Sequence, residues 1–149
     1  MAVSTRTATA VHAMTFLAYW TDEGLQSSAT MADSLESNPV LVRRVLGALR
    51  DAGLVYALEG SGGGWQLTRP AEEISLLDAY AAVEDSRALL PTHAHPPNQN
   101  CVIGRHAQSV LEAEFSAAQR ALDEHLAQTT IADVLERILG RERTWTSSS

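Results

Sequence analysis

The sequence predicts a mainly α fold with a small β-hairpin wing (α+β), that is, a winged helix-turn-helix followed by a long dimerisation helix. Three observations predict this fold. A capped amphipathic helix fills residues 38–53, a glycine-rich hairpin pattern follows over 54–67, and an unbroken helical pattern runs from about 102 to 127. A helix followed by a hairpin is the order of a recognition helix and its wing, and therefore indicates DNA binding.

The residues before this helix predict two further helices. Apolar residues at helical spacing indicate a first helix over about residues 5–20. A second segment, 30–35, follows two serines and is long enough for about two helical turns. Only Glu36 and Ser37 separate it from the next helix, so the two together form a helix-turn-helix.

The helix over 38–53 has a predicted start, a predicted end and one apolar stripe. Asn38 caps its first turn. Pro39 is tolerated at the first helical position, because a backbone N–H there would have no partner within the helix. Gly53 supplies the left-handed residue that ends the helix. The apolar stripe should face a core and consists of Val42, Val45, Leu46 and Leu49.

The opposite face of this helix carries Arg43 and Arg44 beside Val40 and Gly47. Two guanidinium groups on a narrow face can enter a major groove and donate paired hydrogen bonds to guanine or phosphate. The alternative is an ordinary amphipathic helix with two surface arginines.

Residues 54–58 and 65–67 have the pattern of strands around a glycine-rich tip at 60–64. The tip lacks the lysine and the following Ser or Thr of a P-loop, so it does not predict an ATP site. Its bare backbone amides can approach a DNA phosphate, and a plain hairpin turn is the alternative. The residues predicted to bind DNA are Asn38, Pro39, Val40, Arg43, Arg44, Arg50, Ser61, Gly62, Gly63, Gly64 and Trp65.

The second half begins with a helix and a proline-containing loop. Ser75 and Asp78 have the spacing of a capping box. The helix that they open is predicted to bury Leu76, Leu77, Tyr80 and Val83. Three prolines make residues 86–100 a loop, and two threonines at 129 and 130 restart a short helix.

The long helix over about 102–127 predicts a dimer. Its apolar residues repeat in a pattern close to heptads, and a helix this long on a small domain usually buries such a stripe against a partner. The alternative is a helix folded back on its own domain. The predicted interface residues are Ile103, Ala107, Val110, Leu111, Phe115, Ala118, Leu122 and Leu126.

These elements divide the chain into three predicted regions. Residues 1–75 form a winged helix-turn-helix DNA-binding domain, and 76–140 form a helical dimerisation region that includes the loop and the long helix. Residues 141–149 are expected to be a frayed C-terminal tail.

Several segments together resemble a known family. AVHAMTFLAYW, MADSLESNPVLVRRVLGALRDAGLV and GSGGGW, followed by ISLLDAYAAVED, NCVIGRH and TTIADVL, are similar to the Rrf-two family of bacterial winged-helix transcription regulators. The resemblance covers nearly the whole chain. It implies a transcriptional repressor that binds double-stranded DNA at a pseudo-palindromic operator, as a homodimer whose paired long helices cross.

The charge distribution bears on DNA binding. The net charge is -7, and the chain contains no lysine. Residues 1–70 contain five arginines and six carboxylates, whereas residues 71–149 contain six arginines and twelve carboxylates. The acid therefore lies mainly behind the predicted DNA-reading head. Affinity per monomer should be modest, so dimerisation on two half-sites is needed. Glu59 stands where members of the similar family commonly have a basic residue, so the wing should touch DNA mainly through backbone amides.

The sensing chemistry is predicted to centre on Cys101. One thiolate cannot hold the usual four-cysteine iron-sulfur cluster, and the spacing of His93, His95, Cys101 and His106 matches no familiar zinc site, so neither a metal nor a cofactor is expected. Cys101 precedes the long helix, where the helix start and Arg105 favour a redox-reactive thiolate. Three alternatives remain: a buried inert cysteine, a mixed site of His12 with the partner's Cys101, and an unknown small-molecule effector between wing domain and dimer helix.

Other functional classes have less support. No nucleophile and base lie in a recognisable motif, so an enzyme is not expected. A winged-helix protein-protein adaptor with an acidic rear half is the competing class. The start of the chain lacks a signal-peptide pattern, no apolar run is long enough to span a membrane, and the single cysteine excludes a disulfide framework, so a cytoplasmic location is expected.

Overall fold

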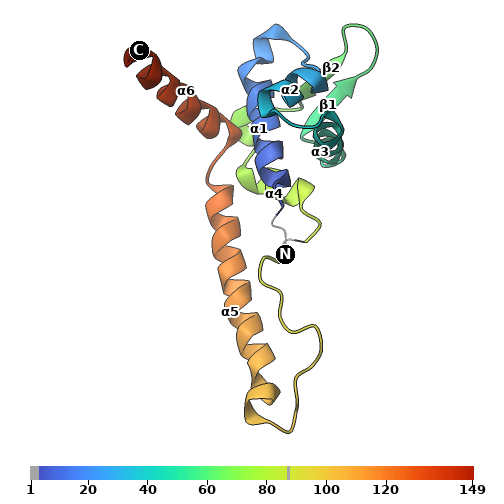
Figure 1. Cartoon of the computed structure of the whole chain (residues 1–149), viewed down its shortest axis with the longest axis vertical. Helices are drawn as coiled ribbons and strands as arrows, with labels where there is room; N and C mark the ends of the chain where they lie inside the picture. Colours follow the sequence, from blue (N-terminus) through green and yellow to red (C-terminus); the bar gives the residue numbers. More distant parts are fainter. Residues whose placement is uncertain (1–3, 87) are drawn as a thin grey trace.

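The computed structural model describes residues 4–86 and 88–149 and confirms the predicted fold class. Helices α1 (Arg6–Tyr19), α2 (Ser28–Leu35) and α3 (Pro39–Asp51) precede the antiparallel hairpin of β1 (Val55–Leu58) and β2 (Gly64–Leu67). Two short 3-10 helices, η1 (Thr21–Glu23) and η2 (Ala71–Glu73), lie in the connections. Helices α4 (Leu76–Val83), α5 (Val102–Ala127) and α6 (Ile131–Ser147) complete the chain. Helix α5 projects away from the other helices and the hairpin, which together form the head of the molecule (Figure 1).

One hydrophobic core holds the head together. The predicted α3 stripe is fully buried, and it packs with residues of α1 and α2 and with the start of the hairpin. The core also takes in Ile74, Ala79, Val83 and Ile131. It therefore does not end at residue 75, the boundary expected for the DNA-binding domain, because α4 and the first turn of α6 bury their apolar residues in the same place.

Helix α4 begins as predicted but buries a different set of side chains. The Asp78 N–H donates to Ser75 Oγ at 3.0 Å and the Ser75 N–H donates to Asp78 Oδ2 at 2.9 Å, which completes the capping box. Ala79 is buried together with the predicted Tyr80 and Val83, whereas Leu76 and Leu77 are only half-buried. The prediction was wrong for these two leucines because the first turn of α4 lies at the edge of the core.

Helix α6 is longer than predicted. It reaches Ser147, so the expectation of a frayed tail was wrong for residues 141–147. Its start is fixed by a second capping box, in which the Asp133 N–H donates to Thr130 Oγ1 at 3.0 Å. Near its end, hydroxyl groups donate to carbonyl oxygens four residues earlier, as Ser147 Oγ does to Arg143 O at 2.7 Å. Serines and threonines that bond back in this way are compatible with a helix.

The residues just before α4 pair with the residues just after α5 in the head. The Leu76 N–H donates to Thr129 O at 2.9 Å, and the Ile131 N–H donates to Ile74 O at 2.8 Å. This antiparallel bridge pairs Ser75 with Thr130. The chain therefore leaves the head through α4, runs out and back along α5, and returns to the strand-like residues beside which it left.

The loop before α5 runs back along that helix (Figure 1). The Leu89 N–H donates to Gln119 Oε1 at 3.2 Å, and the backbone of Asn98 approaches Gly104 so closely that a Cβ there would meet the Asn98 carbonyl. At the head, Arg6 pairs with Asp85 at 3.2 Å. Helix α5 and the loop that lies against it together form an arm, residues 88–127 in the described part of the chain. In the part of the chain that the structure describes, no helix combines the length and the apolar character that crossing a membrane requires.

We expect Ile131→Ala to lower the free energy of unfolding by about 2–5 kcal/mol, because its side chain is 0% exposed in the core of the head. Ile138→Ala, on the same helix with a 51% exposed side chain, is the matched control and should cost less than about 1 kcal/mol. Urea denaturation followed by circular dichroism measures both. Equal losses would contradict the assignment of α6 to the core.

Candidate nucleic-acid interface

The cationic face of α3 is set by the burial of its opposite stripe. The Val40 N–H donates to Asn38 Oδ1 at 2.8 Å, which confirms the predicted cap, and Pro39 stands in the first turn. With the stripe inside the core, Val40, Arg43 and Arg44 are exposed. Within residues 4–86 and 88–149, no ion pair holds either arginine. Their guanidinium groups are therefore available to a ligand.

The end of α3 is closed by a Schellman motif. The Gly53 N–H donates to Arg50 O and the Leu54 N–H donates to Leu49 O, both at 2.9 Å, and Gly53 has a φ of +78°. This confirms the predicted helix stop. It also directs the chain straight into β1, so the hairpin leaves α3 with a fixed geometry.

Arg50 has a different environment from Arg43 and Arg44. Its Nε lies 3.7 Å from Asp51 Oδ1, and its guanidinium carbon lies 5.8 Å from the centre of the Trp65 ring. Trp65 is half-buried and packs against the core. The ring therefore links the end of α3 to β2, and Arg50 presents its charge beside the wing.

The hairpin is held to the helix-turn-helix by a second strand-like contact. Gln26 and Trp65 exchange two backbone hydrogen bonds of 3.0 and 2.8 Å. Gly64 has a φ of +151°, and a Cβ at this position would lie 2.7 Å from Gln26 O. Gly64 is thus needed for the approach of two backbone segments. Ser61 and Gly62 are exposed at the tip, whereas Gly63 is half-buried.

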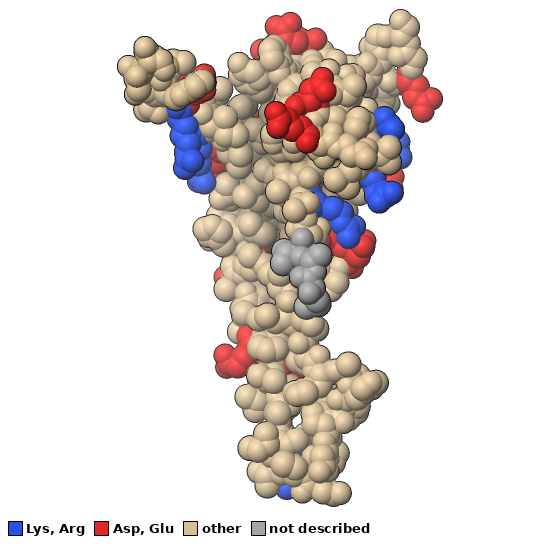
Figure 2. Space-filling view, in the orientation of Figure 1, with Lys and Arg blue, Asp and Glu red and all other residues tan. Residues whose placement is uncertain are grey.

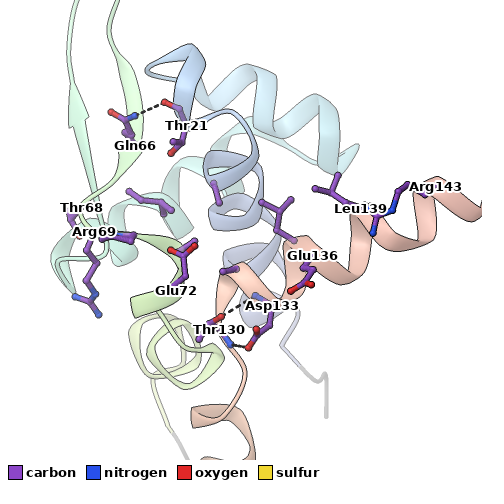
Figure 3. A pocket seen from close by; sticks show the side chains of 16 residues that line it. Thr21, Gln66, Thr68, Arg69, Glu72, Thr130, Asp133, Glu136, Leu139 and Arg143 are labelled. Carbon is purple, nitrogen blue, oxygen red and sulfur yellow. Dashed lines mark hydrogen bonds between the residues drawn. The ribbon is translucent and has the colours of Figure 1, made fainter.

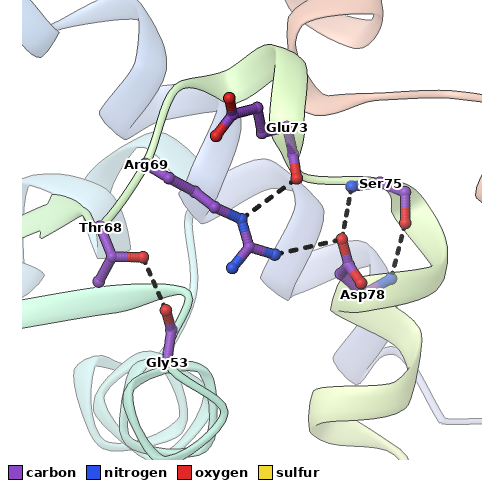
Figure 4. A network of polar contacts seen from close by, with 6 residues as sticks. All are labelled: Gly53, Thr68, Arg69, Glu73, Ser75 and Asp78. Carbon is purple, nitrogen blue, oxygen red and sulfur yellow. Dashed lines mark hydrogen bonds and ion pairs between the residues drawn. The ribbon is translucent and has the colours of Figure 1, made fainter.

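A network of polar contacts fixes the other end of the wing (Figure 4). Thr68 Oγ1 donates to Gly53 O at 2.6 Å, so the exit of β2 is tied to the end of α3. Arg69 Nε donates to Glu73 O at 3.2 Å, and its Nη2 lies 3.5 Å from Asp78 Oδ2. Sequence reasoning missed Thr68 and Arg69, because their contacts with Gly53 and Asp78 join separate elements, which no local spacing marks.

The charge of this face is local. Figure 2 shows basic side chains gathered over α3, with acidic groups on other parts of the same face. Glu59, at the end of β1, is exposed. A nucleic acid would therefore meet a small cationic surface rather than a broad one, and additional contacts are required for tight binding.

Cys101 occupies the N-cap position of α5 and is exposed. The nearby backbone amides of Gly104 and Ile103 lower the pKa of its thiol. Arg105, which the sequence suggested as the assisting cation, instead donates to Gln99 O at 3.3 Å. The helix start, and not the arginine, favours the thiolate.

The donor set does not fit an iron-sulfur cluster or a zinc ion. Among the residues that the structure describes, no three His, Cys, Asp or Glu side chains come together as a metal site. His12 Nε2 lies 2.8 Å from Ser34 Oγ, and burial lowers the pKa of the imidazole. Cys101 directly precedes α5, and within one chain the start of α5 lies far from α1 (Figure 1).

The predicted interface residues of α5 divide into two groups. Ile103 and Val110 are 73% and 58% exposed, and Val102 beside them is 64% exposed. Ala118 is also exposed. The others, Ala107, Leu111, Phe115, Leu122 and Leu126, are half-buried. The outer half of the arm therefore presents an apolar surface, while the loop and α4 cover part of the inner half.

Comparisons with known proteins agree with this geometry. The family model "Rrf2: Iron-dependent Transcriptional regulator" matches residues 3–137. The HTH-type transcriptional regulator YwnA of Bacillus subtilis is 33% identical over 136 residues, covering 91% of this chain and 98% of YwnA. The structure of T. potens IscR superimposes with a TM-score of 0.70 at 25% identity, covering 93% and 88% of the two chains. Oxidised CymR of Staphylococcus aureus gives a TM-score of 0.66 at 28% identity, covering 91% and 97%.

We expect iodoacetamide to alkylate Cys101 with a half-maximal rate at a lower pH in the folded chain than in the urea-unfolded chain. The amides of Gly104 and Ile103 stabilise the thiolate only when α5 is formed. Mass spectrometry of the alkylated fraction over time, at several pH values, gives the rate of alkylation as a function of pH. Arg105→Gln should leave the folded curve unchanged, and a shift of that curve to higher pH would contradict the role given to the amides.

Proposed function

The chain belongs to the Rrf2 (Rrf-two) family of transcriptional regulators, and we propose that it is a homodimeric repressor that reads a pseudo-palindromic operator through α3 and the wing. Members of the family are DNA-binding regulators and not enzymes. One observation carries the more specific proposal: Arg43 and Arg44 stand exposed, without an ion pair among the described residues, on a helix whose two ends are fixed. We place the regulator in the cytoplasm, where its operator would lie.

The geometry supports insertion of α3 into a major groove. Asn38, Pro39 and Val40 form the exposed start of the helix, and the arginines follow within its first two turns. In this orientation Arg43 and Arg44 reach base edges or phosphates, because guanidinium groups match guanine O6 and N7. The amides of Ser61 and Gly62 meet the neighbouring phosphates. Arg50 adds a charge next to the wing.

The proposed roles of the remaining glycines and of Trp65 are more indirect. Gly63 and Gly64 shape the tip so that its amides stay accessible, and Trp65 fixes the distance between α3 and β2. A rigid wing limits the conformational entropy lost on binding. We therefore infer that these three residues support DNA contact chiefly by positioning the tip.

Two copies are needed because one copy offers little positive charge. The outer half of α5 supports a homodimer, since Ile103, Val110 and their neighbours form an apolar surface that one chain leaves in solvent. A two-fold symmetric contact would pair this surface with itself and place two α3 helices on two half-sites. A dimer bound across a promoter excludes the transcription machinery, which is the basis of the repressor assignment.

The signal is proposed to act without an iron-sulfur cluster. The family model carries the description iron-dependent, yet the donor set of this chain does not fit iron. Cys101, exposed and with a lowered thiol pKa, is the candidate for oxidation. It directly precedes the outer half of α5, so its oxidation would introduce a polar group beside the proposed dimer surface.

We expect the double variant Arg43→Ala/Arg44→Ala to bind a fragment from the promoter of the protein's own gene at least about 100-fold more weakly, because each bidentate contact is worth roughly 1–3 kcal/mol. The slope of log affinity against log salt should fall by about one for each arginine that no longer neutralises a phosphate. Fluorescence anisotropy at several salt concentrations measures both values. Arg137→Ala/Arg141→Ala, a matched pair of exposed arginines on α6, should leave them unchanged.

Two outcomes of these measurements would contradict the proposed DNA contact. Equal losses in the two double variants would show that α3 is not the reading helix. If the unmodified protein prefers no promoter fragment, the operator proposal fails and the acidic rear half favours a protein-protein adaptor.

We expect Val110→Asp to convert a dimer into monomers, raising the dissociation constant by at least about 100-fold, because an unpaired carboxylate would be buried in the interface. Analytical ultracentrifugation measures the mass in solution. Leu58→Asp is the matched control, since Leu58 has the same 58% exposure but lies on the wing. A dimer that survives Val110→Asp, or a monomeric unmodified chain, would contradict the proposed interface.

A further inference from the structure

A cavity of about 980 Å³ lies between the end of the wing and α6 (Figure 3). One wall consists of β2 and the following residues through η2, and the opposite wall is the exposed side of α6. Its volume is at the upper end of the range for small-molecule sites. Leu67 on the wing side and Leu135 and Leu139 on α6 give it apolar surfaces that face a common space.

The charged groups of the cavity are not equivalent. Arg69 is held by Asp78 and by the Glu73 carbonyl, and Asp133 is held in the capping box of α6. Glu72 on η2 and Glu136 on α6 line the cavity from opposite walls. In the part of the chain that the structure describes, neither carboxylate has an ion-pair or hydrogen-bond partner. Arg143 stands two helical turns beyond Glu136.

We propose that this cavity binds a small amphipathic amine, with its ammonium group between Glu72 and Glu136 and its hydrocarbon part against Leu67, Leu135 and Leu139. A cation placed between two carboxylates forms charge-assisted hydrogen bonds with both. A neutral alcohol gains only the apolar contact. A carboxylate beside Glu72 and Glu136 would be repelled by their like charge. The guanidinium group of Arg143, two helical turns beyond Glu136, lies apart from this pair (Figure 3).

The cavity is connected to the wing by hydrogen bonds. Gln66 lines it from β2. Its Oε1 accepts a hydrogen bond from the Tyr56 hydroxyl at 2.7 Å, and its Nε2 donates to Thr21 O at 3.2 Å. Thr68 also lines it and is bonded to Gly53 at the end of α3. A ligand that draws α6 toward η2 therefore shifts the wing and the end of α3 together, relative to α6. This last step rests on the proposed DNA-binding function, whereas binding of the amine does not.

The binding test uses the full chain without DNA. n-Hexylamine is titrated and followed by nitrogen-15 chemical shifts, with 1-hexanol and hexanoate as probes of equal length. We expect saturable shifts at Gln66, Ala71 and Leu135, and an affinity for hexylamine at least about tenfold above that for hexanol, the effect of one charged hydrogen bond. Equal binding of the three probes, or shifts that map to another part of the chain, would overturn the proposal.

Two variants make the test specific. Glu72→Gln/Glu136→Gln keeps the shape of both side chains and should weaken hexylamine binding at least about tenfold while leaving hexanol unchanged. Glu114→Gln/Glu124→Gln on α5 removes the same charge from exposed positions outside the cavity and should change neither. Leu139→Trp fills the apolar part and should abolish binding of every probe. Hexylamine that binds the first double variant as tightly as the unmodified chain contradicts the ammonium site.

The regulatory step is tested separately. Saturating hexylamine should change the affinity for a promoter fragment at least about fivefold in the unmodified protein, since allosteric coupling is typically about 1–3 kcal/mol. Tyr56→Phe breaks the hydrogen bond to Gln66 and should reduce this effect without changing amine binding. An unchanged DNA affinity overturns the coupling alone. If the unmodified protein binds the amine but binds no promoter fragment, with or without hexylamine, the proposed function fails instead.

Discussion

The burial of the α3 stripe is the constraint on which the rest of the structure depends. Val42, Val45, Leu46 and Leu49 lie on one side of the helix and are buried among α1, α2 and the start of the hairpin. Each such side chain contributes roughly 1.5–3 kcal/mol, whereas an exposed ion pair contributes about 0–1 kcal/mol. The apolar stripe therefore determines the rotation of α3. Arg43 and Arg44 point outward because of what lies opposite them, and their function follows from packing that they do not themselves stabilise.

A second effect is the restriction of the wing. A two-stranded hairpin alone is marginally stable in water. Here the backbone of Gln26 pairs with Trp65, the Thr68 hydroxyl bonds to Gly53, and the Trp65 ring lies beside Arg50. These contacts join β2 to the residues before α2 and to the end of α3. The two elements consequently move as one body, and a change at the base of the wing is transmitted to the recognition helix.

What could be predicted from the sequence follows the range of the interactions. The cap at Asn38, the capping box at Ser75 and the glycine stop at residue 53 depend on neighbours within a few positions, and all three are confirmed. The exposed arginine face followed from helical periodicity. The Thr68–Gly53 and Arg69–Asp78 contacts join separate elements and left no local pattern. Leu76 and Leu77 were assigned to the core because periodicity identifies an apolar face but not how far a neighbouring element covers it. The cavity beside α6 was not foreseen, because its two walls, residues 66–72 and 130–143, are far apart in the sequence and no local pattern brings them together.

The bridge between residues 74–76 and 129–131 has an evolutionary consequence. The arm follows α4, whose buried residues belong to the head, and it returns to the head at this pairing, as an inserted segment returns to a domain at a tolerant site. Insertions or deletions of whole helical turns in α5 would leave both capping boxes and the core residues in place. Descendants of one ancestral head could therefore acquire arms of different reach and recognise binding sites of different spacing, while the part that reads each site stays under separate selection.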